Sequence, residues 1–268
     1  MSAAWFHFHG DLTAFLPRAA RSGPFAAECA RAATVKNTIE ALGVPHTEVG
    51  RVTVAGEPAT LGRIVRDGEW IEVFPHDPGR APFESPLAFI ADAHMGGLAR
   101  MLRMLGFDTV YDNTLDDARI VEQARRERRV VLTRDRELLK RRDVLRGCYV
   151  RALKPEAQLG ELGRRYDLVA RMQPFTLCLH CNRSLVSVDG GAVSQHVPER
   201  IRERYHNFRR CPGCEQIYWE GSHWTRMRSV LAETLEVAPA QIAPDRTAPA
   251  GDAVSPLETR RPNRARYR

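Results

Sequence analysis

The chain has 268 residues, 43% of them hydrophobic, which is enough for one large or two to three small globular domains. It has no run of roughly 20 apolar residues that could span a membrane and no segment typical of a secretory signal at its start, so we expect a cytoplasmic protein without a membrane partner. The net charge is +7, and sixteen Lys and Arg stand against eight Asp and Glu between residues 119 and 171, a surplus that indicates either a nucleic-acid partner or an arginine-rich solvated surface.

Residues 1–80 have the pattern of a small α+β domain. WFHFHGDL predicts a strand, and TVKNTIEALG predicts a short helix that Thr34 can cap and Gly43 can end. RVTVAGEPA and EWIEVFP predict further strands. This order resembles the ubiquitin-like β-grasp proteins, particularly the small sulfur carriers of thiamine and molybdopterin synthesis. Those carriers activate a free C-terminal Gly-Gly, whereas this chain runs on through PHDPGRAPFESP; we therefore expect a binding or regulatory domain that docks to a protein partner.

The segment 75–86 is rich in Pro and Gly and predicts a linker. Residues 87–172 then alternate strands with helices, which is typical of an open parallel α/β sheet. The predicted strands are LAFIAD, FDTVYD, RVVLT and GCYVRA. The helix after the first strand has an apolar stripe made of Leu98, Met101, Leu102 and Leu105.

Carboxylates follow the ends of these predicted strands. Asp92 ends the first strand, Asp135 follows the third, and Asp116 and Asp117 lie in the turn after the second. Because sites in parallel sheets form beyond the carboxyl ends of the strands, three of these acids can meet at one edge, where Mg²⁺ or Mn²⁺ would relieve their repulsion. Each acid could instead only cap a helix, with Asp117 a good N-cap for the second helix.

The sequences FIADAHMGGLARMLRMLGFDTVYD and DDARIVEQARRERRVVLTRDREL, with the paired cysteines that follow, resemble the PIN-like ribonuclease family named for the C-terminal domain of the mutator-seven exonuclease. The resemblance covers residues 87–227. It implies a metal-dependent RNase with Asp92, Asp117 and Asp135 as its acids, Asp116 as an alternate for Asp117, and products with a 5′-phosphate.

Basic residues near these acids are candidates for binding RNA. Arg134 adjoins Asp135 and could contact the scissile phosphate or make a structural ion pair. Arg100 and Arg103 are predicted to point away from the apolar stripe, where they would contact RNA or solvent.

Residues 174–235 contain two C-x₂-C pairs separated by 29 residues. This pattern predicts a structural Zn²⁺ held by Cys178, Cys181, Cys211 and Cys214, with a redox role as the alternative. VPERIRERYHNF predicts a helix or loop between the pairs. His223, in the aromatic and basic segment YWEGSHWTRMR, is a further candidate RNA contact. Residues 236–268 are rich in Ala, Pro and Arg and predict a disordered basic tail.

The sequence therefore predicts an α/β protein: a PIN-like open parallel sheet with helices, preceded by an α+β β-grasp domain and followed by a small zinc ribbon. The expected function is metal-dependent hydrolysis of RNA. A non-catalytic RNA-binding adaptor that uses the ribbon and the basic helices is the alternative. In a third interpretation the acids only cap helices, and the β-grasp domain carries the function by docking to a protein partner.

Overall fold

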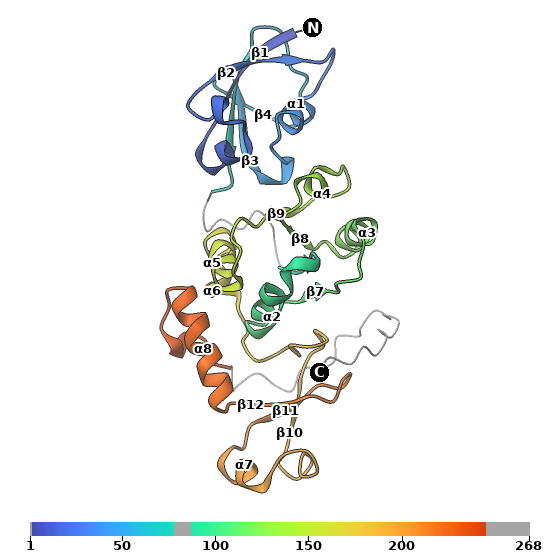
Figure 1. The fold of residues 1–268 in the computed structure, drawn as a ribbon, viewed down its shortest axis with the longest axis vertical. Coiled ribbons are helices and arrows are strands. Elements are labelled where there is room, and N and C mark those ends of the chain that lie inside the picture. Colours follow the sequence, from blue (N-terminus) through green and yellow to red (C-terminus); the bar gives the residue numbers. More distant parts are fainter. Residues whose placement is uncertain (1, 78–86, 245–268) are drawn as a thin grey trace.

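The computed structural model describes residues 2–77 and 87–244. These form an elongated molecule in which a β-grasp sheet, an α/β domain and a cysteine-paired unit follow one another along the long axis (Figure 1). Most of the predicted linker and the predicted tail from residue 245 onward lie outside the described residues. No helix in the part of the chain that the structure describes is both long and apolar enough to cross a membrane.

The N-terminal sheet has five strands in the order β2-β1-β5-β3-β4, with β1 parallel to β5 and the other pairs antiparallel. One face packs on helix α1, whose N-cap is Thr34 as predicted: its side chain accepts a hydrogen bond from the backbone N–H of Asn37. Residues alternate along β1, so that Phe6 and Phe8 are buried while Trp5 stays 46% exposed. The elements are β1 (Ser2–Phe8), η1 (Gly10–Phe15), η2 (Arg18–Ala20), β2 (Phe25–Cys29), α1 (Val35–Ala41), η3 (His46–Glu48), β3 (Val49–Val54), β4 (Glu57–Ala59) and β5 (Trp70–Pro75).

The α/β domain has four parallel strands in the order β7-β6-β8-β9. Both faces of this sheet are buried, as short apolar runs in a parallel sheet require. Phe89 and Leu132 point into a core shared with α2 and α5, whereas Ile90 and Val131 point into a core shared with α3 and α4. The elements are β6 (Phe89–Ala91), η4 (Ala93–Met95), α2 (Gly96–Met104), β7 (Thr109–Tyr111), α3 (Asp117–Glu127), β8 (Val130–Thr133), α4 (Arg136–Lys140), β9 (Gly147–Tyr149), α5 (Pro155–Tyr166) and α6 (Leu168–Arg171).

The cysteine-paired unit has a three-stranded antiparallel sheet in the order β10-β11-β12. A helix does lie between the two C-x₂-C pairs, as predicted, and its small apolar cluster is centred on Val193, Val197 and Phe208. The elements are β10 (Val186–Val188), α7 (Glu199–Arg204), β11 (Phe208–Arg210), β12 (Ile217–Trp219), α8 (Ser222–Thr234) and η5 (Pro239–Gln241).

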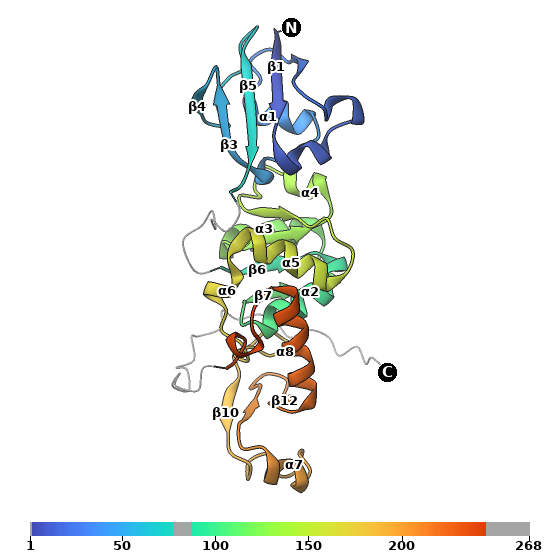
Figure 2. The same ribbon diagram turned by 90° about the vertical axis from the view of Figure 1, so that its left-hand side faces the viewer.

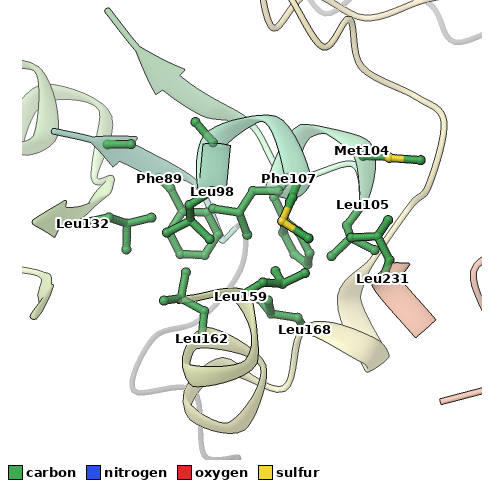
Figure 3. Close-up of a cluster of buried hydrophobic side chains, with 14 of the residues drawn as sticks. Phe89, Leu98, Met104, Leu105, Phe107, Leu132, Leu159, Leu162, Leu168 and Leu231 are labelled. Carbon is green, nitrogen blue, oxygen red and sulfur yellow. The ribbon is translucent and has the colours of Figure 1, made fainter. Parts of the chain in front are cut away.

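Helix α8 belongs to the core of the α/β domain, although it follows the cysteine pairs in sequence. Leu231 lies in the same buried cluster as Leu105 and Leu159 (Figure 3), and Trp224 joins that cluster against Phe175. Figure 2 shows α8 running beside the α/β domain toward the strands of the cysteine-paired unit. Helix α8, which the prediction placed with the ribbon, therefore packs in the core of the α/β domain, and the domain boundaries stay a prediction.

The segment just after α8 differs from the prediction of a disordered tail. Residues 236–244 were expected to be disordered, but they include η5, and Ile242 is fully buried in the main core. The predicted fold class is confirmed: a mixed α/β protein with a β-grasp sheet, then a parallel sheet, then a four-cysteine cluster that fits a zinc ribbon.

Candidate functional site

The order of the parallel strands changes direction between β6 and β8. From β6 the chain passes through α2 to β7 on one side, and then through α3 to β8 on the other side. This reversal is a topological switch point, beyond which α/β proteins commonly bind ligands. Asp92 directly follows β6, and Asp135 lies two residues beyond β8, so both are at the carboxyl edge of the two strands that flank the switch point.

Thr133 connects these two aspartates. Its hydroxyl donates a hydrogen bond to Asp92 Oδ2 at 2.7 Å and accepts one from the backbone N–H of Asp135 at 2.9 Å. Thr133 is fully buried, Asp92 is half-buried and Asp135 is exposed. The buried hydroxyl therefore fixes the Asp92 carboxylate and the start of the loop that carries Asp135. Sequence reasoning missed Thr133, because a threonine at the end of a strand has no distinctive pattern.

The turn after β7 differs from the sequence prediction in one detail. Asp116, not Asp117, is the N-cap of α3, and its Oδ1 accepts a hydrogen bond from the backbone N–H of Arg119 at 2.9 Å. Asp117 is the first residue of the helix and is exposed, with no side-chain hydrogen bond or ion pair to any described residue. The assignment of Asp117 as the cap is therefore wrong.

Asp112 is a further acid at this edge that the sequence analysis did not single out. It directly follows β7, and its neighbour Tyr111 pairs in register with Ala91, which directly precedes Asp92. Its Oδ1 accepts hydrogen bonds from the backbone N–H and the hydroxyl of Thr114. The final Asp of FDTVYD was the available signal, since it ends a predicted strand just as Asp92 does.

The candidate acids share an edge but do not form a tight cluster. Within residues 2–77 and 87–244, none of the groups of three or more metal-binding side chains with donor atoms within 4.8 Å of one another contains an aspartate. Three of the acids also act as caps: Asp92 accepts from the backbone N–H of Ala93, Asp116 caps α3, and Asp135 caps α4. The assignment of Asp92, Asp117 and Asp135 as catalytic metal ligands stays a prediction.

Two glycines allow other elements to approach the start of α2 beside Asp92. A Cβ atom on Gly96 would lie 2.8 Å from the hydroxyl oxygen of Tyr111, and one on Gly97 would lie 2.5 Å from Pro155 Cγ. Tyr111 donates its hydroxyl to the backbone carbonyl of Ala93 at 2.9 Å. The sequence HMGG after Asp92 is thus explained by close packing against β7 and α5.

The candidate arginines have different environments. Arg134 and Arg100 are exposed and make no ion pair or side-chain hydrogen bond with the described residues, so both are available to a ligand. Arg103 is buried, which contradicts its predicted outward orientation. It donates hydrogen bonds to the backbone carbonyls of Thr109, Leu179 and His180 at 2.9–3.1 Å, and burial lowers the pKa of its guanidinium. Arg103 therefore ties the first cysteine pair to the α/β domain, and its burial contradicts the surface position on which its predicted contact with RNA depends.

The four paired cysteines converge on one point. Three Sγ–Sγ distances are 3.3, 3.5 and 3.7 Å, close to the edge of about 3.8 Å that a tetrahedron with 2.3 Å zinc–sulfur bonds would have. Burial opposes ionisation of Cys178, but hydrogen bonds from the Tyr218 hydroxyl and from backbone N–H groups lower its pKa to about 7. The cluster at Cys178, Cys181, Cys211 and Cys214 therefore fits a tetrahedral thiolate-bound metal ion.

His223 lies in the first turn of α8 and is exposed, with no side-chain partner among the described residues. Its neighbour Trp224 is buried. The structure thus leaves His223 accessible to a ligand, and its role in RNA binding stays a prediction.

Comparison with known families agrees with this architecture. The chain matches the Mut7-C RNAse domain over residues 87–231 and the Mut7-C ubiquitin domain over residues 1–79. The chain belongs to the Mut7-C RNAse domain family. Membership suggests a nuclease-like role and confirms the family that the sequence motifs indicated.

Two crystal structures of small archaeal modifier protein 1 from Haloferax volcanii are similar to part of this Mut7-C protein. One shares 21% identity over 28% of this chain and 98% of the other, and the second shares 20% identity over 32% of this chain and all of the other, each with a TM-score of 0.23. The curated proteins contain no match to the chain.

In this Mut7-C family member the ubiquitin-like domain docks on the β9 edge of the RNAse domain. Glu48, only 3% exposed, accepts a hydrogen bond from the backbone N–H of Tyr149 at 2.9 Å and pairs with Arg165 at 2.8 Å. Arg136 in α4 donates to the backbone carbonyl of Phe15 at 3.2 Å and lies over its ring. The contact thus reaches α4, the helix that Asp135 caps.

Proposed function

We propose that this protein is a metal-dependent ribonuclease that hydrolyses RNA phosphodiester bonds at the carboxyl edge of its parallel sheet. The observation that carries the proposal is the pair Asp92 and Asp135, linked through the buried Thr133 at the switch point of a Mut7-C RNAse domain. Such an edge is where this kind of sheet offers side chains to a ligand.

The donor set at this edge suits Mg²⁺ or Mn²⁺. Asp92, Asp117 and Asp135 would hold the ion, with Asp116 as an alternate and Asp112 nearby. Asp135 and Asp116 each use only Oδ1 in capping, which leaves Oδ2 without a partner among the described residues. When bound, such an ion supplies a Lewis acid at the phosphate and lowers the pKa of a water nucleophile.

The side chains of the protein position the substrate and the carboxylates. Thr133 orients Asp92, so that its carboxylate does not have to reorganise when the substrate binds. Arg134 is exposed next to Asp135, and a guanidinium matches the geometry of a phosphate. Arg100 and His223, both exposed, would contact the RNA further along.

The four cysteines are proposed to hold one structural Zn²⁺. Four thiolates leave no open position for water, and the apolar cluster of the ribbon is small, so a metal would supply much of its stability. Helix α8 follows the ribbon in the chain and packs in the core of the RNAse domain, which places the ribbon beside that domain. The β-grasp domain remains the candidate docking module for a protein partner.

One observation favours a second candidate, a non-catalytic RNA-binding adaptor. Asp92, Asp116 and Asp135 all cap helices, and no three of the candidate acids come within 4.8 Å in the described residues. In an adaptor these three acids would serve only as helix caps. It would bind RNA through Arg134, Arg100 and the ribbon.

The deciding experiment compares RNA cleavage by the full chain with cleavage by Asp92→Asn and Asp135→Asn, with Mn²⁺ or Mg²⁺ present and after chelation. Asp143→Asn is the matched control, because Asp143 is an exposed acid that precedes β9, at the opposite edge of the same sheet. RNA binding is measured on the same preparations.

We expect cleavage that requires the metal, is lost in both site variants and persists in Asp143→Asn. Equal cleavage in all four proteins would indicate a contaminating nuclease. RNA binding without cleavage in all four would refute the nuclease and support the adaptor.

A further inference from the structure

The β-grasp sheet carries a group of metal-binding side chains on the face opposite α1. His7 and His9 alternate with the buried Phe6 and Phe8 along β1, so both point to this face. On the neighbouring parallel strand β5, Glu72 is the register partner of His7. Residues from two adjacent strands therefore bring two imidazoles and one carboxylate together.

The three side chains are already close enough to share an ion. One donor atom from each of His7, His9 and Glu72 lies within 4.8 Å of the other two. His9 Nε2 and Glu72 Oε1 are 3.2 Å apart. This matches the donor–donor distance of about 3.3 Å expected around a tetrahedral ion with bonds of 2.0–2.1 Å. All three residues are half-buried, so the group is accessible from solvent.

Neighbouring residues hold two of these donors in place. Thr53 Oγ1 donates a hydrogen bond to Glu72 Oε2 at 3.3 Å, which leaves Oε1 directed toward His9. The His9 ring stacks on Phe74 with an interplanar angle of 1° and a centroid distance of 4.1 Å. The guanidinium of Arg51 lies 3.8 Å from the centroid of Phe74. Because the imidazole already covers one face of Phe74, Arg51 must cover the other, which keeps its charge away from the donors.

We propose that His7, His9 and Glu72 bind a divalent transition-metal ion of the Zn²⁺ class. Two imidazoles and one carboxylate favour such ions over Mg²⁺ or Ca²⁺, which prefer oxygen ligands. Three protein ligands leave a coordination position open to water or to a donor from another molecule. Support of the ligands by neighbouring groups, as Thr53 and Phe74 provide here, is typical of protein metal sites.

This site is separate from the two metal sites described above. It lies in the β-grasp sheet, which the α/β domain separates from the cysteine-paired unit along the long axis of the molecule (Figure 1). It also shares no residue with the carboxylate edge of the RNAse domain. Its occupancy can therefore be measured whether or not the protein cleaves RNA.

The test counts metal ions on the full chain without an affinity tag, with the cysteine cluster filled first with Zn²⁺. Isothermal titration with Zn²⁺ gives the affinity of any further site, and Co²⁺ absorption gives its ligand type, since thiolate ligands add intense charge-transfer bands that His and Glu ligands do not. Glu72→Gln is the sharpest variant, because the amide can still hydrogen-bond to His9 and Thr53 but is a poor metal ligand. His9→Ala removes a second ligand, and His196→Ala is the control, an exposed histidine in the ribbon.

We expect the parent protein and His196→Ala to bind one ion more per chain than Glu72→Gln and His9→Ala bind under the same conditions, with Co²⁺ bands free of thiolate charge transfer. Glu72→Gln and His9→Ala should lose at least 10-fold in affinity, and Thr53→Val roughly 10-fold. Unchanged thermal midpoints and one retained Zn²⁺ would show that the variants fold. The absence of a further ion in the parent, or binding that Glu72→Gln and His9→Ala leave unchanged, would overturn the proposal and reduce the contact to an ordinary His9–Glu72 hydrogen bond.

Discussion

Replacing Thr133 by valine tests whether its hydroxyl positions the two candidate acids. The substitution keeps the shape of the side chain but removes a donor to Asp92 Oδ2 and an acceptor for the N–H of Asp135. A hydrogen bond to a charged group contributes roughly 1.5–3 kcal/mol, and a neutral one, such as that from the N–H of Asp135, roughly 0.5–1.5 kcal/mol. The extra buried methyl of valine offsets part of this, so we expect a net loss of about 2–3 kcal/mol in the free energy of unfolding.

Thr109→Val is the matched control for this experiment. Thr109 is also fully buried, but it lies at the start of β7, at the opposite edge of the same sheet. Its hydroxyl donates one hydrogen bond, to the neutral carbonyl of Phe107 at 2.9 Å. Losing it should cost only about 0.5–1.5 kcal/mol. Urea denaturation of both variants measures the difference.

The effect on RNA cleavage should separate the variants further. Loss of a residue that orients a metal-binding carboxylate typically costs roughly 10–100-fold in metal affinity or activity, so Thr133→Val should show a drop of that size and need more Mn²⁺. Thr133→Ser restores the hydroxyl and should recover most of the activity. If Thr133→Val and Thr109→Val lose equal stability and cleave RNA equally well, the reasoning about Thr133 is refuted.

Three further outcomes are expected. Glu48→Gln should lower the free energy of unfolding by about 3–5 kcal/mol in urea denaturation, because Arg165 would keep a buried charge without its partner; a loss below 1 kcal/mol would contradict this. Burial and the nearby charge of Arg165 lower the pKa of His76 below 6.5, so the unfolded chain binds the proton more readily and stability should fall as the pH drops through 6.5. Thermal midpoints between about pH 8 and pH 5.5 measure this slope, which His76→Asn should reduce. Cys211→Ser should lose the bound zinc and lower the thermal midpoint, whereas Cys29→Ser should keep the zinc content of the parent.

Local sequence patterns were sufficient to predict most of the helices and strands. Thr34 caps α1 because a threonine before an amphipathic run is a local signal. Between the cysteine pairs the sequence left a helix or a loop open, and the structure has the helix α7 there. Strand β2 was missed because FAAEC has a single large apolar residue, and as an edge strand it is only partly buried. The choice between Asp116 and Asp117 as cap could not be made from two adjacent aspartates, since it depends on the backbone conformation of one residue.

The errors at the site have a tertiary cause. Arg103 lies outside the apolar stripe of α2, so periodicity placed it in solvent, but the first cysteine pair, more than 70 residues later, covers it. The carboxyl edge with Asp92 and Asp135 was predictable because parallel strands end together. How the acids are arranged at that edge was not, because it depends on the bond between Thr133 and Asp92 from a neighbouring strand.

The structure shows which of the surplus basic residues between 119 and 171 are held in ion pairs and which are exposed. Arg129 pairs with Asp108 and Glu127, and Arg165 is enclosed at the ubiquitin-like interface, so these charges serve the fold and are not free for RNA. Arg134 and Arg136, two residues apart, have different surroundings. Arg134 is exposed on one side of Asp135, whereas Arg136 on the other side is held by Phe15 of the ubiquitin-like domain.

The ubiquitin-like domain therefore contacts the helix that carries Asp135 at its N-terminus. Asp135 caps α4, and the first residue of that helix is the one that Phe15 holds. The five-residue helix α4 (Arg136–Lys140) therefore has its cap at the candidate site and its first residue at the interface with the ubiquitin-like domain. Asp92, in contrast, accepts its hydrogen bond from Thr133 within the parallel sheet, so of the two linked acids Asp135 is the one that lies beside this interface.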